Sequence, residues 1–372
     1  MHLGYKTTCH AVVGAALALA AANAARADIT TTLSGFGTVG GTFTGDSAYS
    51  FRHDASEFTG ATNQFDIALE SRVGVQAKFD FGSGFSVTAQ EVLRQRGNTD
   101  FSPGTEWLYA QYSPNSDWQV RLGRVVLATF LYSDSRQVGF AAPWFRSPVE
   151  VYSALPFDYL DGGQITWQKT LGQFVVGVEG SYGSTQGVFE SGGLTITSDS
   201  KDIFNAAATL SYGDLLLRVA QTSLNVPTSI PLSATLSDSY QLHETFTSVG
   251  GQYDNGKAVV IGEWARTKQN DAPILDEPLA SSSQWYAAAG WRFGKFLPLA
   301  VYGHVKEQQS LLYAPSEYGS WSASLRYDVV SNVALKAEVS RAQASNAQYW
   351  VTANTASSAY VNVYSIGADF VF

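Results

Sequence analysis

One stretch of this 372-residue sequence carries charged side chains whose chemistry would be the electrostatic sorting of solutes in water. Basic and acidic side chains on opposite sides of a narrow aqueous passage create a field that orients ions. The candidate groups are Arg121, Arg124, Asp134, Arg136, Arg146, Glu150 and Asp158, with Arg72 and Arg94 on earlier segments.

Catalytic and metal-binding signatures are missing from the sequence. Beyond residue 27, histidine occurs only at His53, His243 and His304, far apart and without the spacing of metal ligands. His304 has no motif beside it and is expected to be a polar side chain facing an aqueous lumen. The single cysteine, Cys9, precedes residue 27, so no thiol chemistry is expected later in the chain. The sequence therefore predicts neither an enzyme nor a cofactor.

The charged stretch belongs to the longest connection in the sequence, residues 128–161. A connection of this length is usually functional or disordered. It is too rich in large apolar residues for disorder: Phe130, Phe140, Trp144, Phe145, Leu155 and Phe157. We expect this connection to fold into the interior of the protein, where its apolar side chains pack against the surrounding inner surface and narrow a water-filled passage. Covering an outer rim or a subunit interface is the alternative.

The elements that position these residues are predicted to be β-strands. Between Phe65 and Asp80, apolar side chains alternate with polar ones, interrupted at Ser71. The same alternation returns at 204–212, 285–293, 321–327 and 333–340. Helical spacing would mix the two sets, whereas a strand separates them onto two faces.

About sixteen such strands are expected, joined by short turns alternating with longer polar loops. An even number of strands places both termini on the short-turn side. The strand ranges are 29–44, 64–80, 85–96, 104–112, 118–127, 162–170, 173–184, 201–212, 215–224, 243–253, 257–268, 283–293, 298–308, 318–328, 333–344 and 359–372. The longer polar loops are 45–63, 185–200, 225–242, 269–282 and 345–358.

The composition favours strands that face lipid. Charged residues are only 15% of the chain, aromatic residues are 13%, and no later stretch approaches the ~20 apolar residues of a membrane helix. Closed barrels cross a bilayer without exposing backbone polar groups to hydrocarbon. Aromatic residues beside the short turns suggest an interfacial girdle. We therefore expect an all-β transmembrane antiparallel barrel; a soluble β-sandwich is the alternative.

The N-terminus is expected to be a cleaved export signal, residues 1–27. Lys6 precedes the small-residue apolar run 11–25, and Ala25-Arg26-Ala27 offers a cleavage site before Asp28. Cleavage would leave the barrel as residues 28–372 and, by removing Lys6 and Arg26, change the formal net charge from −9 to −11. An uncleaved N-terminal anchor is the alternative. Such an acidic chain is not expected to bind nucleic acid.

The last strand carries the most specific local pattern. Alternate positions hold Tyr364, Ile366, Ala368, Phe370 and the C-terminal Phe372. In this ending, in length and in strand rhythm, the chain resembles the Gram-negative general porin family. The resemblance implies that Tyr364, Ile366, Phe370 and Phe372 form an assembly signal read by the barrel-assembly machinery in the outer membrane.

The same resemblance gives residues 128–161 the place of the third extracellular loop of general porins, which narrows the pore. It also implies that wall arginines, here Arg72, Arg94 and Arg121, face loop carboxylates, here Asp134, Glu150 and Asp158, and that the charged residues named above line the pore. The familiar Pro-Glu-Phe-Gly-Gly signature is absent, and Ser147-Pro148-Val149-Glu150 is only a loose counterpart. The resemblance also implies a homotrimer in contact with outer-membrane lipid and lipopolysaccharide. The expected function is passive diffusion of ions and small hydrophilic solutes. The alternatives are a channel specific for a sugar or carboxylate, lined by Trp144 and Phe145, an outer-membrane hydrolase, and a structural or adhesion barrel.

Overall fold

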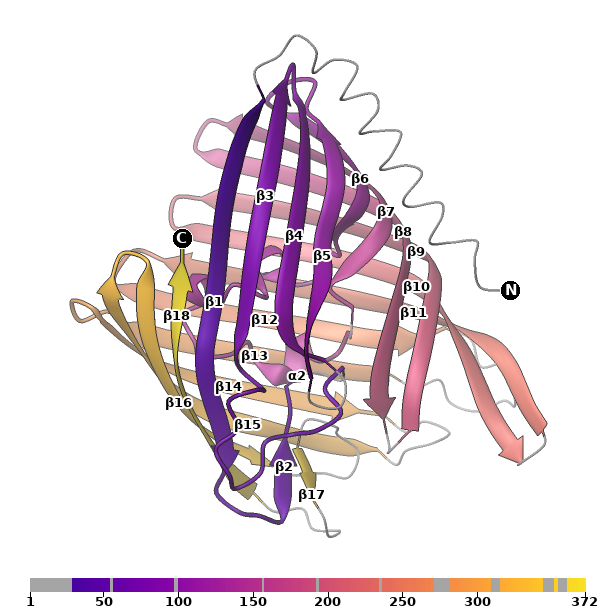
Figure 1. Ribbon diagram of the computed structural model, residues 1–372, viewed down its shortest axis with the longest axis vertical. Coiled ribbons are helices and arrows are strands. Elements are labelled where there is room, and N and C mark those ends of the chain that lie inside the picture. Colours follow the sequence, from indigo (N-terminus) through magenta and orange to yellow (C-terminus); the bar gives the residue numbers. More distant parts are fainter. Residues whose placement is uncertain are drawn as a thin grey trace.

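A single antiparallel sheet closes on itself in the computed structural model (Figure 1). The structure describes residues 29–53, 56–96, 100–155, 157–191, 194–233, 236–270, 281–308, 315–343, 351–353 and 360–372. Around the barrel the order is β1, β18, β16, then β15 down to β3. Each barrel strand pairs with the barrel strands before and after it in the chain, and β1 closes the barrel by pairing with β18. The predicted all-β barrel of sixteen strands is confirmed. The expected export segment 1–27 lies outside the described residues.

The barrel strands are close to the predicted ranges, with differences mainly at the ends away from the short turns. They are β1 (Thr30–Thr44), β3 (Arg72–Gly82), β4 (Phe85–Arg96), β5 (Asp100–Tyr112), β6 (Trp118–Val126), β7 (Tyr159–Leu171), β8 (Phe174–Ser191), β9 (Leu194–Tyr212), β10 (Leu215–Ser233), β11 (Leu236–Asp254), β12 (Ala258–Gln269), β13 (Ser281–Trp291), β14 (Phe296–Glu307), β15 (Ser316–Val330), β16 (Val333–Gln343) and β18 (Tyr360–Val371). Two further strands, β2 (Tyr49–Phe51) and β17 (Val351–Ala353), pair with each other outside the barrel sheet.

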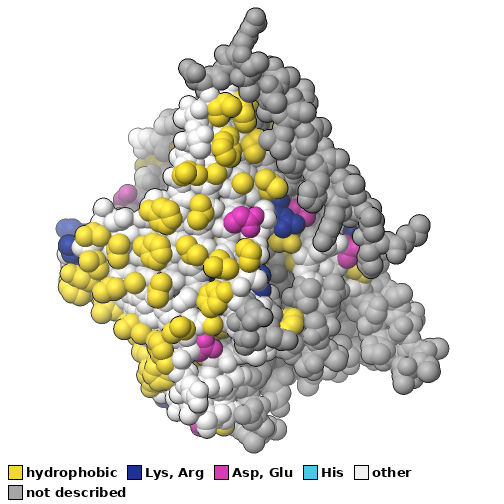
Figure 2. Space-filling view, viewed as in Figure 1, with side chains coloured by type: hydrophobic (Ala, Val, Ile, Leu, Met, Phe, Trp, Pro, Cys, Tyr) yellow, Lys and Arg dark blue, Asp and Glu magenta, His cyan; other side chains and the backbone are white. Residues whose placement is uncertain are grey.

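Alternation along each strand separates an outer apolar face from an inner one. On β16, Leu335 and Val339 are 48% and 41% exposed, whereas Lys336 and Glu338 between them are buried. Hydrophobic side chains cover much of the visible outer wall in Figure 2. Aromatic residues stack across strands beside the short turns, as Phe85 does with Tyr112 at 4.4 Å between ring centroids.

The strand predicted at 64–80 begins only at Arg72. The preceding residues form a turn in which the Asp66 carboxylate accepts hydrogen bonds from the backbone N–H of Ala68 and Leu69. Leu69 is buried while Ile67 is 61% exposed, although alternation placed them on one face. An aspartate that caps a local turn competes with the strand ladder, and here the turn is preferred.

Two stretches predicted as polar loops, 185–200 and 225–242, are extensions of strands. β8 pairs with β9, and β10 with β11, to the ends of both hairpins, whose tips at 192–193 and 234–235 are outside the described residues. Once strands leave the apolar band they can carry polar residues on both faces, so alternation disappears while pairing continues. The prediction relied on alternation and ended these strands too early.

Strands β12, β13 and β14 are apolar on both faces. Val260 is 51% exposed on the outer face, whereas Ile261, Leu297 and Leu299 are buried on the inner face. The inner side chains belong to one core cluster with aromatic residues of the connection after β6. The expected wet inner surface therefore holds for only part of the barrel.

The barrel closes between β1 and β18. Gly35 and the C-terminal Phe372 exchange backbone hydrogen bonds of 2.8 and 2.9 Å. The Phe372 ring covers Gly35 so closely that a Cβ there would lie 2.3 Å from it. Gly37 is covered by Phe370 in the same way. Among the described residues, no helix is long and apolar enough to cross a membrane.

Candidate functional site: the connection after β6 and the facing wall

The connection between β6 and β7, residues 127–158 and called here the β6–β7 segment, packs against the inner face of β11–β14. Trp144 is completely buried and lies edge-on to Tyr286 of β13, with ring centroids 5.6 Å apart. Phe130 packs against Tyr152 at 4.8 Å and Phe246 of β11 at 5.3 Å. The short helix α2 (Val149–Tyr152) contacts β12, β13 and β14. The apolar inner half of the wall is where the aromatic residues of this segment are buried.

Two cations of the wall hold the middle of the segment. Arg326 Nη1 donates to the carbonyl oxygens of Phe140 and Ala142 at 2.7 and 2.9 Å. Lys336 Nζ donates to the carbonyl oxygens of Gly139 and Ala142 at 2.7 and 2.8 Å, and pairs with Asp369 at 2.8 Å. We call Arg326 and Lys336 the cation clamp. Charge-assisted hydrogen bonds are stronger than neutral ones, so the clamp fixes residues 139–142 on β15 and β16.

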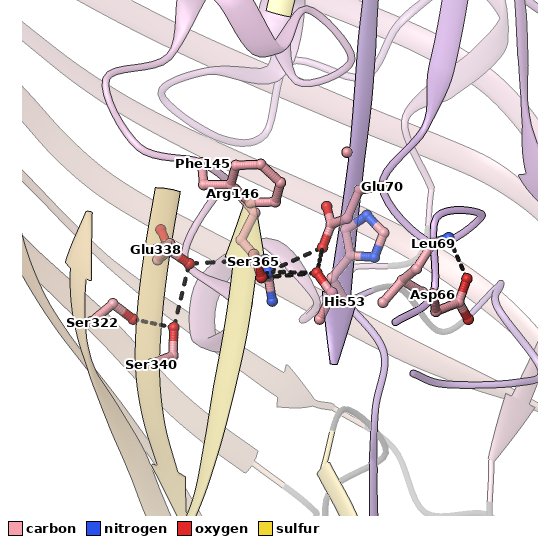
Figure 3. A network of polar contacts seen from close by, with 12 residues as sticks. His53, Asp66, Leu69, Glu70, Phe145, Arg146, Ser322, Glu338, Ser340 and Ser365 are labelled. Atoms are coloured by element: carbon pink, nitrogen blue, oxygen red, sulfur yellow. Dashed lines mark hydrogen bonds and ion pairs between the residues drawn. The ribbon is translucent and has the colours of Figure 1, made fainter. Parts of the chain in front are cut away.

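Arg146 fixes the segment to the closing strands (Figure 3). Its guanidinium lies 3.0 Å from Glu70 and 3.9 Å from Glu338, and donates to Thr42 and Ser365. Burial alone would raise the pKa of Glu70, but the Arg146 charge, assisted by His53 and Thr42, holds it below its ordinary value. Arg146 is thus a buried structural cation that joins the segment to several strands.

Glu150, on α2, does not face the arginines. Its carboxylate accepts a hydrogen bond of 2.5 Å from Ser320 and sits over Gly303, where a Cβ would lie 2.2 Å from it. Burial raises the pKa of Glu150 to about 7, and the nearby Glu338 charge adds to the shift. The expected role as a carboxylate opposite the basic wall is wrong for this residue, because α2 turns it toward β14 and β15.

Three of the predicted arginines come together with Arg146 around one cavity. Arg72 and Arg94 lie opposite each other on β3 and β4. With Arg136 they line a cavity of about 50 Å³, to which Glu57 and Glu70 also contribute. Asp158 borders this region but is neutralised within the segment, since it pairs with Arg136 and accepts a 2.9 Å hydrogen bond from Gln137. The cavity is therefore rich in cations.

A second, larger cavity of about 430 Å³ lies beside β5–β10 and brings Arg121 and Asp134 together. Arg121 donates to Gln111 and Gln164 at 2.9 and 3.0 Å and lies over the Tyr109 ring. The sequence interpretation missed the other two charges that line it, Glu179 and Arg218, which are 3.9 Å apart. The signal was present: Arg218 lies between Leu217 and Val219, so alternation alone assigns it to the inner face.

Two predicted inner residues lie on the outer face. Arg124 follows the exposed Leu122 by two residues and forms a bidentate pair with Asp161, with distances of 2.8 and 2.7 Å. His304 alternates with the buried Val305 and lies 3.0 Å from Glu317. Both assignments to the lumen are wrong, because the position within the strand decides the face whatever the polarity of the side chain.

A closed barrel with an apolar outer wall and charged inner cavities defines an outer-membrane β-barrel protein. The model of the Gram-negative porin family matches residues 14–369, and the chain belongs to that family of outer-membrane channels. No curated protein matches the sequence.

Solved structures share this fold at low sequence identity. OmpT of Vibrio cholerae, an outer membrane protein folded in vitro in its trimer form, aligns with a TM-score of 0.61 and 14% identity over 92% of this chain and 99% of that chain. The anion-selective porin from Comamonas acidovorans gives 0.59 and 15% over 93% and 100%. The outer membrane channel DcaP of Acinetobacter baumannii gives 0.59 and 12% over 92% and 97%. These likenesses concern the fold alone.

Proposed function

We propose that this protein is a passive diffusion channel for ions and small hydrophilic solutes, narrowed by the β6–β7 segment. One observation carries the proposal: the segment packs on the apolar inner half of the wall, formed by β11–β14, and leaves charged cavities along the other half. One of these cavities, lined by Arg72 and Arg94, lies toward the ends of β3 and β4 away from their short turn and is called here the upper cavity. The other is lined by Arg121, Asp134, Glu179 and Arg218. Charged walls around a narrow aqueous path give ion selectivity.

A preference for anionic solutes, carboxylates among them, is the second candidate. Four arginines and only two glutamates line the upper cavity. The anion-selective porin from Comamonas acidovorans has the same fold, which is compatible with this candidate. A sugar path along Trp144 and Phe145 has less support, because both rings are buried against the wall and present little surface to a solute.

Ion selectivity in planar bilayers tests both candidates. Replacing Arg72 and Arg94 together by glutamine should shift the reversal potential toward cations, since the upper cavity loses two positive charges. Asp134→Asn should shift it the opposite way. Both effects should shrink at about 1 M salt, where the screening length is about 3 Å. Arg341→Gln, on the outer face, is the matched control, and reversal potentials equal to the control in the arginine variant would exclude the selectivity mechanism.

Deletion of residues 138–152 tests the constriction itself. The change removes α2 and the stretch held by the cation clamp, so single-channel conductance should rise. A folded deletion variant that conducts like the wild type would show that the β6–β7 segment does not limit the passage.

The channel is proposed to act as a homotrimer, as the trimer form of the Vibrio cholerae protein does. Contacts with lipopolysaccharide, and with the barrel-assembly machinery through Tyr364, Ile366, Phe370 and Phe372, are proposed on the same family grounds. Electrophoresis without heating should show an oligomer that converts to monomer on boiling.

A further inference from the structure

A serine, a histidine and an asparagine on the outer face of β10 and β11 have the hydrogen-bonded arrangement of a serine hydrolase triad. His243 Nε2 lies 3.2 Å from Ser223 Oγ, and His243 Nδ1 lies 2.6 Å from Asn225 Oδ1. Asn225 and His243 are direct partners across the two strands, and Ser223 is two residues away on the same face. We call these residues the outer triad.

The hydrogen bonds fix the proton positions that catalysis requires. An amide oxygen only accepts, so Nδ1 donates its proton to Asn225, and Nε2 is left with a lone pair to accept from the Ser223 hydroxyl. A nucleophile in contact with a base, with the base oriented by a third group, is the recurring arrangement of acyl-transfer enzymes on unrelated folds. Asn225 is therefore a positioning residue, and Ser223 and His243 would be catalytic.

The outer triad faces away from the channel. Thr222 and Leu224, on either side of Ser223, are buried on the inner face, as is Phe246 on β11. The odd-numbered positions of these strands point the other way, to the outside. They include the partly exposed Ser223, Asn225 and His243. The triad is thus separate from the lumen and from the proposed channel function.

The position of the outer triad along β10 fits the depth at which the ester groups of membrane lipids are found. Along β10 the outer face changes from apolar Leu217 and Val219, which are 43% and 46% exposed, to polar Gln221 and then Ser223. Ser223 is eight residues beyond Leu215, where β10 begins. Eight residues span about 26 Å along a strand, or about 20 Å of depth at a tilt of about 40°, near the outer limit of an apolar band of about 25 Å. With Leu215 taken as the opposite edge of the band, this estimate puts Ser223 close to the level where acyl chains meet headgroups.

Two neighbouring features fit a reaction at Ser223. The register between β10 and β9 shifts between Ser223 and Asn225, and Asp202, at this irregularity, has a φ of +51°. Bulges and left-handed non-glycine residues are enriched beside active sites. Lys268, exposed on β12, is the direct partner of Thr245, which in turn is the partner of Ser223. A lysine two strands away can place its ammonium near an oxyanion that forms at Ser223.

From this geometry we propose that the outer triad hydrolyses acyl esters of lipids in the outer leaflet. Ser223 Oγ attacks the ester carbonyl carbon while His243 Nε2 takes the hydroxyl proton. The bond to the alcohol breaks, and the departing alkoxide takes that proton from His243. Water, activated in turn by His243, then attacks the acyl-serine ester, releasing a fatty acid and regenerating Ser223. The products are a free fatty acid and a lysolipid.

A covalent probe of serine nucleophiles gives the most direct test. The folded full-length protein is treated with a long-chain alkyl fluorophosphonate and digested for mass spectrometry. The adduct is expected on Ser223, lost in Ser223→Ala and His243→Ala, and retained in Ser283→Ala, another outer-face serine. A folded wild-type protein that conducts ions but carries no adduct on Ser223 overturns the proposal.

Turnover is measured on phosphatidylethanolamine in mixed micelles as released fatty acid. Ser223→Ala and His243→Ala should lose about 10³-fold or more in rate, the scale of triad losses. Asn225→Ala should lower kcat while leaving KM nearly unchanged, since Asn225 orients His243 and does not bind the lipid, and Asn225→Asp should restore kcat. Activity that survives Ser223→Ala belongs to a contaminant and counts against the site. Conductance should be unchanged in all these variants, so failure here leaves the channel proposal untouched.

Discussion

Glu150 is a buried carboxyl group on the short helix α2, with the Ser320 hydroxyl as its hydrogen-bond donor. Burial raises the pKa of this group to about 7, so the folded state prefers the neutral form at pH values below about 7. The pKa is raised above that of the unfolded chain, so this stabilisation is complete below about pH 4.5 and is lost as the pH rises through about 7. A shift of this size corresponds to roughly 3 kcal/mol.

We therefore expect the docking of α2 to weaken between about pH 5 and about pH 8. Hydrogen exchange of the α2 amides should quicken over that range in the wild type and change less in Glu150→Gln, which keeps the shape without the titration. An identical pH response in the two proteins would show that another group controls α2.

At the scale of elements, the cation clamp links two strands to the segment that they face. Arg326→Met removes two charged hydrogen bonds to Phe140 and Ala142, worth about 1.5–3 kcal/mol each. Lys336 is left in place, because removing it would strand the buried Asp369 carboxylate. The released segment should fluctuate, so single-channel recordings should become noisier. Arg341→Met, on the outer face of the adjacent strand, is the control and should record like the wild type.

Phe372 directly follows β18 and is joined to Gly35 of β1 by two backbone hydrogen bonds. Removing Phe372 takes away the ring that covers Gly35 and the hydrogen bonds at the seam. Assembly should fail while synthesis and export continue, which unheated electrophoresis of outer membranes detects as loss of the compact barrel. Gly35→Ala tests the seam separately, since its Cβ would displace the ring. Normal levels of barrel from the truncated chain would mean that the C-terminal pattern is dispensable.

At the scale of the whole molecule, a charged cluster interrupts the apolar outer wall. Arg124 pairs with Asp161, donates to the carbonyl oxygen of Thr105, and the Thr105 hydroxyl in turn donates to Glu91. In Figure 2, acidic and basic side chains lie beside each other on an outer surface that carries many hydrophobic side chains. Glu91 lies six residues beyond Phe85, about 15 Å deep at ordinary strand rise and tilt, well inside the apolar band. Charges at that depth are costly against lipid.

If the proposed trimer forms, this wall is the one we expect to face a neighbouring subunit. A photoreactive amino acid in place of Leu122 should then capture a second copy of the chain. The matched control is Val260 on β12, since both side chains are 51% exposed, and it should capture lipid. Lipid adducts at both positions would place the subunit contact elsewhere.

The strand count, the antiparallel order and the inner or outer face of most residues follow from the sequence alone. Alternation determines faces locally, because successive side chains of a strand point to opposite sides. The same rule assigned Arg72 to the inner face correctly. Applied strictly, the same rule also places Arg124 and His304 on the outer face. The prediction put them inside because their side chains are polar. The sequence also indicates which strands the β6–β7 segment packs against. The runs 258–265 and 296–301 are apolar at nearly every position, so these strands are apolar on the inner face as well.

The pairings between residues distant in sequence do not follow from alternation and are seen only in the folded chain. Glu150 and Asp158 were expected to oppose the strand arginines. Instead, the path of the segment turns Glu150 toward Ser320 and pairs Asp158 with Arg136 of the same segment. His243 has no motif beside it, and only the register of β11 on β10 places it between Ser223 and Asn225. Register depends on hydrogen bonding along the whole hairpin, and a shift of one residue would turn His243 to the other face. The barrel is therefore predictable from local alternation, whereas contacts between its side chains depend on register and on the path of the β6–β7 segment.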